Sequence, residues 1–117
     1  MPPTTTFERG QIVLVRFPFT DLTSSKQRPA LVVASKTFIH AGDDLIVAAI
    51  SGQRADRPGE FDHVVQDWKA AGLLMPSVVR AGKLVTLHRD LIRRGLGSLA
   101  ASDQVAVDGL LQRALAP

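Results

Sequence analysis

Short β-rich segments alternate with turns along this chain, and helical residue spacing occurs only near its end, which constrains the fold more than any other feature. The clearest predicted strands are Gln11 to Phe17 (QIVLVRF), Pro29 to Ser35 (PALVVAS) and Asp44 to Ser51 (DLIVAAIS). All three are rich in β-branched or apolar residues and are bounded by proline or polar turn formers. The third is apolar almost throughout, which predicts burial on both of its faces.

The remaining segments predict shorter elements. Phe19 to Gln27 and Gly52 to Glu60 are polar surface loops, and His40 to Asp43 is a turn region. Further along, Phe61 to Gln66 is predicted as a strand, Asp67 to Gly72 as one helical turn, Ser77 to Arg80 and Lys83 to His88 as two strands, and Asp90 to Gly97 as a turn of helix. The Ala81-Gly82 pair is short enough for a hairpin or a bulge.

A single longer helix is predicted from Ser102 to Ala116. Ser102 is its expected N-cap, Asp103 lies in the positive first turn, and Arg113 lies in the negative last turn. The residues at helical spacing, which should dock on the sheet, are Val107, Leu110, Leu111 and Ala114. The expected fold class is therefore mainly β (α+β), a small and strongly curved antiparallel sheet or barrel with a C-terminal helix.

Length and cysteine content bound the organisation of the chain. Its 117 residues, 45% of them hydrophobic, suit one domain with a proper core, which we place at residues 10–117 after a flexible segment at 1–9. The absence of cysteine excludes disulfides and thiolate chemistry. No apolar run is long enough to span a bilayer, so we expect a soluble, cytoplasmic protein with no membrane partner.

Charge alone leaves the class of partner open. The net charge is +3, with ten arginines and four lysines among the basic residues. Arginine's planar fork matches phosphate, so a polyanionic partner is compatible with this balance. An ordinary soluble protein from an arginine-rich genome would show the same balance.

Common cofactor and metal motifs fail on this chain. Gly95, Gly97 and Ala100 have the G-x-G-x-x-A spacing, but no parallel strand precedes them and the chain has no room for the acidic ribose ligand. No serine lies in a G-x-S-x-G motif. The histidines and the adjacent aspartates lack metal-ligand spacing: His40, His63, His88, Asp43 and Asp44. We expect no metal and no cofactor.

Arg28 and Ser51 form one candidate functional site. If the second and third strands pair antiparallel around Ile39 and His40, Arg28 lies near Ser51, so a guanidinium and a hydroxyl meet at one sheet edge. Pro29 keeps Arg28 in an extended conformation. The flanking polar loops add Lys26, Arg54 and Arg57. A structural alternative is that Arg28 pairs with a loop carboxylate such as Asp21, and that Ser51 only ends a strand.

At these residues the chain resembles the MazF/PemK family of toxin endoribonucleases, from type II toxin-antitoxin systems. The matching segments are GQIVLVRFPFTD from Gly10, KQRPALVVAS from Lys26, IVAAISGQ from Ile46, AGLLMPSVVR from Ala71, LVTLHRDLI from Leu84, and LGSL before the final helix. The resemblance implies a compact SH3-like barrel, a homodimer, and metal-free, sequence-selective cleavage of single-stranded RNA that stops translation and growth. It also implies silencing by a cognate antitoxin with an acidic, partly disordered tail.

The resemblance further implies roles for individual residues. Arg28 matches the family's catalytic arginine, and Ser51 stands where many relatives have threonine or serine. Residues expected to contact RNA are Lys26, Gln53, Arg54, Arg57, Ser24 and Ser25. Several relatives carry an acidic residue in the loop before the arginine, whereas this chain offers Ser24, Ser25 and Asp21, so the proton shuttle is not assigned.

Two other classes remain open. The chain could be a gyrase-poisoning toxin of the CcdB type, or a binding module that holds RNA or a peptide without cutting it. The presence of both Arg28 and Ser51 favours the nuclease. We also expect a homodimer that shares apolar surface, because a barrel of this size should not cover both faces of Leu45 to Ile50, and because Leu73, Leu74 and Met75 add an apolar cluster.

Overall fold

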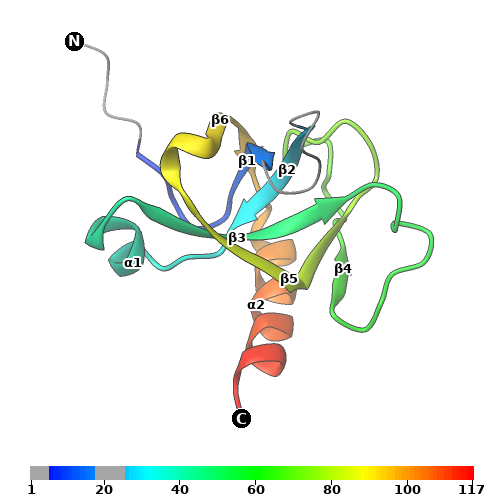
Figure 1. Cartoon of the computed structure of the whole chain (residues 1–117). Helices are drawn as coiled ribbons and strands as arrows, with labels where there is room; N and C mark the ends of the chain where they lie inside the picture. The colour runs from blue at the N-terminus through cyan, green and yellow to red at the C-terminus, as the bar shows by residue number, and fades with distance from the viewer. Residues whose placement is uncertain (1–5, 18–25) are drawn as a thin grey trace.

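A six-stranded antiparallel sheet dominates the computed structural model, which describes residues 6–17 and 26–117 (Figure 1). The strands are β1 (Gln11–Phe17), β2 (Lys26–Val32), β3 (Asp44–Ser51), β4 (Asp62–Val64), β5 (Val78–His88) and β6 (Ile92–Ser98), in the spatial order β4-β5-β3-β2-β1-β6. The helices are α1 (Lys36–Ala41), the short 3-10 helix η1 (Arg89–Leu91) and α2 (Ala101–Leu115).

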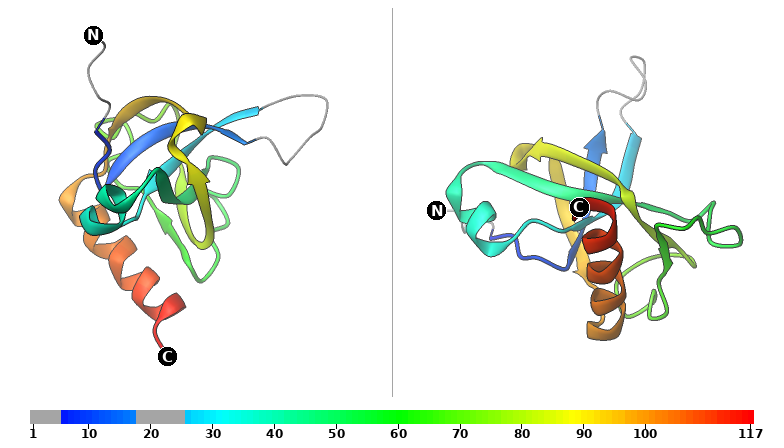
Figure 2. Two further views of the ribbon diagram at one scale, coloured as in Figure 1. Left: turned by 60° about the vertical axis from the view of Figure 1, so that its left-hand side comes forward. Right: turned by 90° about the horizontal axis from the view of Figure 1, so that it is seen from below.

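The sheet is strongly curved but not closed. Long β5 runs through η1 directly into β6, which returns to pair with β1 at the other side of the sheet (Figures 1 and 2). The end strands β4 and β6 do not pair with each other. Helix α2 packs on β5 and β4, and α1 packs on β3. The predicted fold class, a curved antiparallel sheet with a C-terminal helix, is confirmed.

Two hydrophobic clusters cover the two faces of the sheet. In β2, the side chains of Ala30 and Val32 belong to one cluster, and Leu31 between them belongs to the other. Strand β3 is divided in the same way, so both of its faces are covered by side chains of this same chain. Burial on both faces of β3 is thus confirmed. The expectation that a second copy is needed to cover Leu45 to Ile50 is wrong.

The predicted turn after the second strand is a helix in the structure. Helix α1 spans Lys36–Ala41, where only a turn around His40 was expected. Ser35 caps it, because its Oγ accepts a hydrogen bond from the Phe38 N–H at 3.1 Å. Strand β2 also begins at Lys26, three residues before the proline that was expected to open it.

The region after Ser77 differs more strongly from the sequence prediction. The two predicted strands are one, β5, and the bulge alternative is confirmed by a register shift opposite Ala48 and Ala49. The predicted turn of helix from Asp90 to Gly97 is wrong beyond η1, since residues from Ile92 onward form β6. Long-range pairing with β1 makes this glycine-containing segment a strand.

Helix α2 begins without a side-chain cap. Its N-cap is Ala100, so Ser102 does not have the predicted capping role. Asp103 is only 1% exposed. Its carboxylate accepts hydrogen bonds from the backbone N–H groups of Gln66 and Asp67 at 3.0 and 3.1 Å, and its Oδ1 lies 2.7 Å from the Nε2 of His63. This carboxylate therefore fastens α2 to the chain that follows β4.

We predict that Asp103→Asn lowers the free energy of unfolding by about 2 kcal/mol at pH 7, since a buried acceptor and its charge are lost. Burial opposes ionisation of Asp103, but the hydrogen bonds from Gln66, His63 and Asp67 outweigh burial and lower its pKa. The stability supplied by a carboxylate of lowered pKa is present above its unfolded value, near 3.8, and is lost as the pH falls through the folded value. Urea denaturation at pH 7 and pH 3 should show the difference between the two proteins shrinking in acid. Equal stability at pH 7 would contradict this role.

The N-terminal region joins the domain from Phe7 onward. Phe7 is 7% exposed and packs in the cluster with Ile39. Arg9 pairs with Asp108 of α2 and donates from Nε to the carbonyl of Val33 at 3.3 Å. Residues 1–5 of the expected flexible segment lie outside the described residues, so the boundaries at 1–9 and 10–117 stay a prediction. Among the described helices, none is long and apolar enough to cross a membrane.

Candidate active site

The pairing of β2 with β3 has the register that was predicted from the sequence. Ala30 lies opposite Ala49, Leu31 opposite Ala48, and Val32 opposite Val47. Continuing this register toward the start of β2 leads to Arg28 and, on β3, to Ser51. The structure places both residues on the wall of one cavity.

That cavity has a volume of about 650 Å³ and lies against four strands and the segment 72–77. Its apolar lining residues are Leu14, Ile50, Leu73, Leu74, Met75 and Leu96, besides Pro29. Its polar side chains are Gln27, Arg28, Ser51, Gln53, Ser77 and Arg94. The cavity thus combines two guanidinium groups, hydroxyls and amides with an apolar wall.

No aspartate, glutamate or histidine belongs to the described lining of this cavity. Arg28 and Arg94 are exposed, and neither has a carboxylate within ion-pair distance among the described residues. Asp21, the carboxylate considered as a partner of Arg28, lies outside those residues. A pair of cations without neighbouring anions suits a phosphate group, because guanidinium groups bind phosphate oxygens through charge-assisted, bidentate hydrogen bonds.

Met75 fixes the apolar wall beside Ser51. A Cβ atom at Gly52 would lie 2.2 Å from the Sδ of Met75, so the sulfur packs directly on the backbone of Gly52. Buried Ser77 holds this segment, since its Oγ donates to the carbonyl of Met75 at 2.9 Å. At the rim, Leu74 is 97% exposed and Met75 is 54% exposed.

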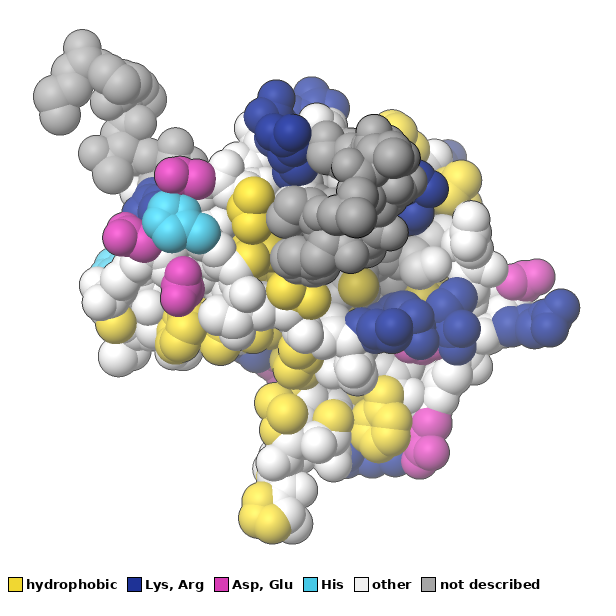
Figure 3. All heavy atoms as spheres, viewed as in Figure 1, with side chains coloured by type: hydrophobic (Ala, Val, Ile, Leu, Met, Phe, Trp, Pro, Cys, Tyr) yellow, Lys and Arg dark blue, Asp and Glu magenta, His cyan; other side chains and the backbone are white. Residues whose placement is uncertain are grey.

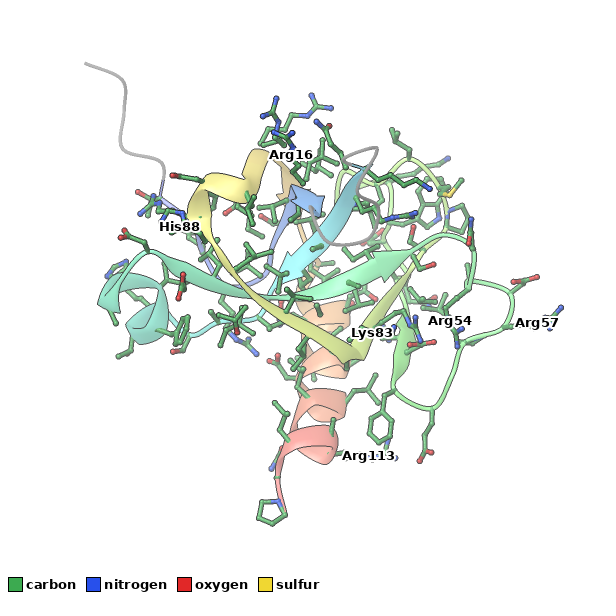
Figure 4. All side chains as sticks on the ribbon, viewed as in Figure 1. Arg16, Arg54, Arg57, Lys83, His88 and Arg113 are labelled. Atoms are coloured by element: carbon green, nitrogen blue, oxygen red, sulfur yellow. The ribbon has the colours of Figure 1, made fainter. Side chains whose placement is uncertain are left out.

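The loop 52–60 is anchored by the carboxylate of Asp62. This carboxylate accepts from the Nε of Arg54 at 3.2 Å, from the N–H of Gly59 at 2.8 Å and from the Nε of Arg80 at 3.4 Å. Burial of Asp62 opposes its ionisation, but the Gly59 N–H and the two guanidinium groups lower its pKa. The Arg54 side chain therefore has a structural partner (Figure 4).

The structure brings together only part of the predicted RNA-contacting set. Gln53 lines the cavity with Arg28 and Ser51. Lys26 is exposed at the start of β2, and Arg57 extends from the tip of its loop, but neither lines the cavity (Figure 4). Ser24 and Ser25 lie outside the described residues.

Several cavity residues were missed by sequence reasoning, among them Gln27, Met75 and Arg94. Gln27 was assigned to a loop, and Met75 was assigned only to a dimer surface. Arg94 was placed in a turn of helix, whereas in β6 it lies opposite Leu14 of β1. The segment from Ile92 to Leu96 shows no alternation of apolar and polar residues, so the sequence carried no local signal that places Arg94 on the sheet.

None of the three histidines belongs to the described lining of the cavity that holds Arg28, and two of them have hydrogen-bond partners elsewhere. His63 contacts Asp103, and the Nδ1 of His88 accepts from the N–H of Asp90 at 3.0 Å at the start of η1. His40 is exposed in the last turn of α1. Within residues 6–17 and 26–117, no group of three or more His, Cys, Asp or Glu side chains is placed to hold a metal ion.

The curved sheet, its C-terminal helix and the cationic cavity define a small α+β protein with a site suited to an anion. The chain belongs to the family described as the PemK-like, MazF-like toxin of type II toxin-antitoxin systems, whose model matches residues 8–115. The resemblance found in the sequence is thereby confirmed.

Solved structures share this fold at low sequence identity. An endoribonuclease from a Mycobacterial species, in complex with its cognate antitoxin, is 18% identical with a TM-score of 0.77, over 96% of this chain and 98% of that one. MazF from Deinococcus radiodurans is 20% identical with a TM-score of 0.76, over 97% and 100%. The Mycobacterium tuberculosis toxin MazF-mt6 is 23% identical with a TM-score of 0.72, over 89% and 94%. No curated protein sequence matches the chain.

Proposed function

We propose that this toxin is an endoribonuclease that cleaves single-stranded RNA, mRNA in particular, in the cytoplasm and so inhibits translation and growth. The observation that carries the proposal is the cavity shared by Arg28 and Ser51, with a second guanidinium on β6. Proteins of the same fold are named endoribonucleases. The presence of both Arg28 and Ser51 in one cavity favours the nuclease over a gyrase poison or a non-catalytic binding module.

In the proposed reaction the substrate's own 2′-hydroxyl attacks the adjacent phosphorus. The new bond joins the 2′-oxygen to phosphorus, and the bond to the 5′-oxygen of the next nucleotide breaks. The 2′-hydroxyl loses its proton and the leaving 5′-oxygen gains one, which gives a 2′,3′-cyclic phosphate and a 5′-hydroxyl end. The protein must stabilise a crowded, dianionic phosphorane between these states.

Arg28 suits this stabilising role. Its planar fork can hold two nonbridging oxygens, a contribution on the order of several kcal/mol once bound RNA displaces water from this exposed side chain. The guanidinium of arginine stays protonated in proteins and is a poor base, so Arg28 stabilises the negative charge of the phosphorane and acts on the leaving 5′-oxygen as a donor. Ser51 donates a hydrogen bond to the same phosphate.

Selectivity for the RNA sequence is assigned to Gln53 and Met75, which line the cavity together with Arg28. Bases of single-stranded RNA can be splayed out and read at their edges. Gln53 presents an amide donor and acceptor beside the apolar side chain of Met75, so a base can lie against the wall while its edge bonds to the amide.

We predict that cleavage survives excess EDTA and that the products carry 2′,3′-cyclic phosphate and 5′-hydroxyl ends. The reason is that the described cavity wall offers cations and hydroxyls but no carboxylate ligand for a divalent ion. Mass spectrometry of the fragments checks the ends. Fragments with 5′-phosphate ends would indicate a metal-activated water as the nucleophile and would remove Arg28 from its role.

Two partners belong to the same proposal. Exposed Leu74 and Met75 offer apolar surface for a two-fold homodimer, although β3 does not require one. An acidic antitoxin tail would fold against the basic residues beside the cavity and displace RNA. Light scattering and competition between the tail and uncleavable RNA test these two proposals.

A further inference from the structure

A second hollow lies next to the cavity, lined by residues of β1, η1 and β6. It has a volume of about 380 Å³, and the arginines Arg89, Arg93 and Arg94 line it. We infer that this hollow binds backbone phosphates of RNA that flank the cleaved bond, which makes it a second RNA subsite formed by η1 and β6. The inference rests on the proposed function and adds residues to it that the sequence did not single out.

The charge of the hollow favours a polyanion. Among the residues that the structure describes, three guanidinium groups line it against a single carboxylate, Asp90. Arg93 and Arg94 are exposed, and no carboxylate lies within ion-pair distance of either among the described residues. Arg89 lies over the ring of buried Phe7, with 5.3 Å from its Cζ atom to the ring centroid, so its position in the hollow is fixed.

The hollow and the catalytic cavity share part of their lining. Arg94 and Gly95 line both, and Gly95 presents no side chain between them. In the ladder, Leu14 of β1 lies opposite Pro29 on one side and opposite Arg94 on the other. Since neighbouring strands are about 4.8 Å apart, the backbones beside Arg28 and Arg94 are separated by about 10 Å. A strand of RNA held by Arg28 can therefore continue over Gly95 to Arg94 and Arg93.

Arg16 extends the same cationic surface. It is exposed near the end of β1, opposite Gln27 of β2. Figures 3 and 4 show Lys and Arg side chains gathered above β1 and β6, where Arg16 is labelled. On the other side of the cavity, by contrast, Arg54 is held by Asp62.

RNA fits this hollow better than an acidic peptide does. A peptide that folds on binding needs apolar anchor sites as well as charge. The exposed apolar side chains near the site, Leu74 and Met75, line the catalytic cavity and not the second hollow. The exposed lining of the second hollow is polar and charged.

The test compares two charge reversals on exposed strand residues. One is Arg93→Glu on β6, and the other is Lys83→Glu on β5, where Lys83 is labelled in Figure 4. The substrates are a 12-nucleotide RNA centred on a mapped cleavage site and a four-nucleotide RNA around the same bond. Arg93→Glu should lower kcat/KM for the longer RNA at least about tenfold through KM, and should lower the magnitude of its salt slope by about 0.7. For the short RNA, both variants should stay within about twofold of the unaltered protein.

Several results would overturn the subsite. Equal values for Arg93→Glu and Lys83→Glu on the longer RNA would do so. A similar loss on both RNAs would also overturn it, because Arg93 would then act at the cleaved bond or on the fold. So would unchanged RNA cleavage combined with lost binding of polyglutamate, which would assign the surface to an acidic peptide. Failure of the unaltered protein to cleave either RNA is a different result, and it would contradict the proposed function itself.

Discussion

Arg28→Ala lowers the rate of RNA cleavage at least about a thousandfold in our account, while the protein stays folded. Removal of one donor that acts on a transition state typically costs 10² to 10³ in rate, and a charged, bidentate donor costs more. The stability of the variant should stay within about 0.5 kcal/mol, because Arg28 is exposed and has no ion-pair partner among the described residues. Single-turnover cleavage and urea denaturation measure the two effects separately.

Two matched variants make this result specific. Lys83→Ala removes an exposed cation of β5 that lies outside the cavity, and it should cleave RNA like the unaltered protein. Ser51→Ala should lower the rate by less than Arg28→Ala does, since a neutral donor is lost in place of a charged one. Wild-type rates for Arg28→Ala would show that the site is assigned wrongly.

Gly72→Ala should destabilise the whole domain by about 3 kcal/mol or more. Gly72 has φ +88°, a conformation that a side chain disfavours, and a Cβ atom there would lie 2.0 Å from the carbonyl oxygen of Leu96. The obstacle is backbone, so β6 and the segment that carries Leu73 and Met75 would have to separate. This contact forms one side of the catalytic cavity, so RNA binding should weaken together with stability.

Gly109→Ala provides the control for that variant. Gly109 lies in α2, and a Cβ atom added there would meet no atom within 4 Å beyond its chain neighbours and the backbone of its own helix. Alanine at this position should raise stability by about 0.5 to 1 kcal/mol, because glycine is a poor helix former. Thermal or urea denaturation of both variants decides the matter, and a Gly72→Ala protein as stable as the unaltered chain would refute the close packing of segment 71–75 on β6.

Local patterns in the sequence predicted the central strands well. Strands β1 and β3 have the predicted bounds, because each carries a run of apolar or β-branched residues that is buried from both sides or nearly so. The start of β2 was misplaced because proline lacks an N–H group. Pro29 is tolerated inside β2, since the pairing with β3 begins only at Ala30 and the preceding residues pair with β1 alone.

The errors lie where distant segments decide the structure. The glycines of β6 weaken any local strand signal, and only pairing with β1 makes that segment a strand. Asp103 was interpreted through the helix dipole, whereas its partners are the backbone of Gln66 and Asp67 and the ring of His63.

The candidate site likewise contains residues that could be predicted from the sequence and residues that only long-range contacts place there. Arg28 and Ser51 come from neighbouring strands whose register could be inferred by placing the centre of their connection near Ile39 and His40. Arg94 and Met75 reach the cavity through the pairing of β6 with β1 and through packing of the segment 72–77, and neither contact is encoded in a short stretch of sequence. Cavity residues that come from segments far apart in the sequence can be identified only once the fold is known.

The central claim is that the Arg28 cavity cleaves RNA, and incubation of the purified protein with a long, single-stranded RNA in excess chelator tests it most directly. We expect discrete fragments from the unaltered protein and intact RNA from Arg28→Ala under the same conditions. Intact RNA from both proteins, at a protein concentration that binds the RNA, would contradict the claim and assign the cavity to binding alone.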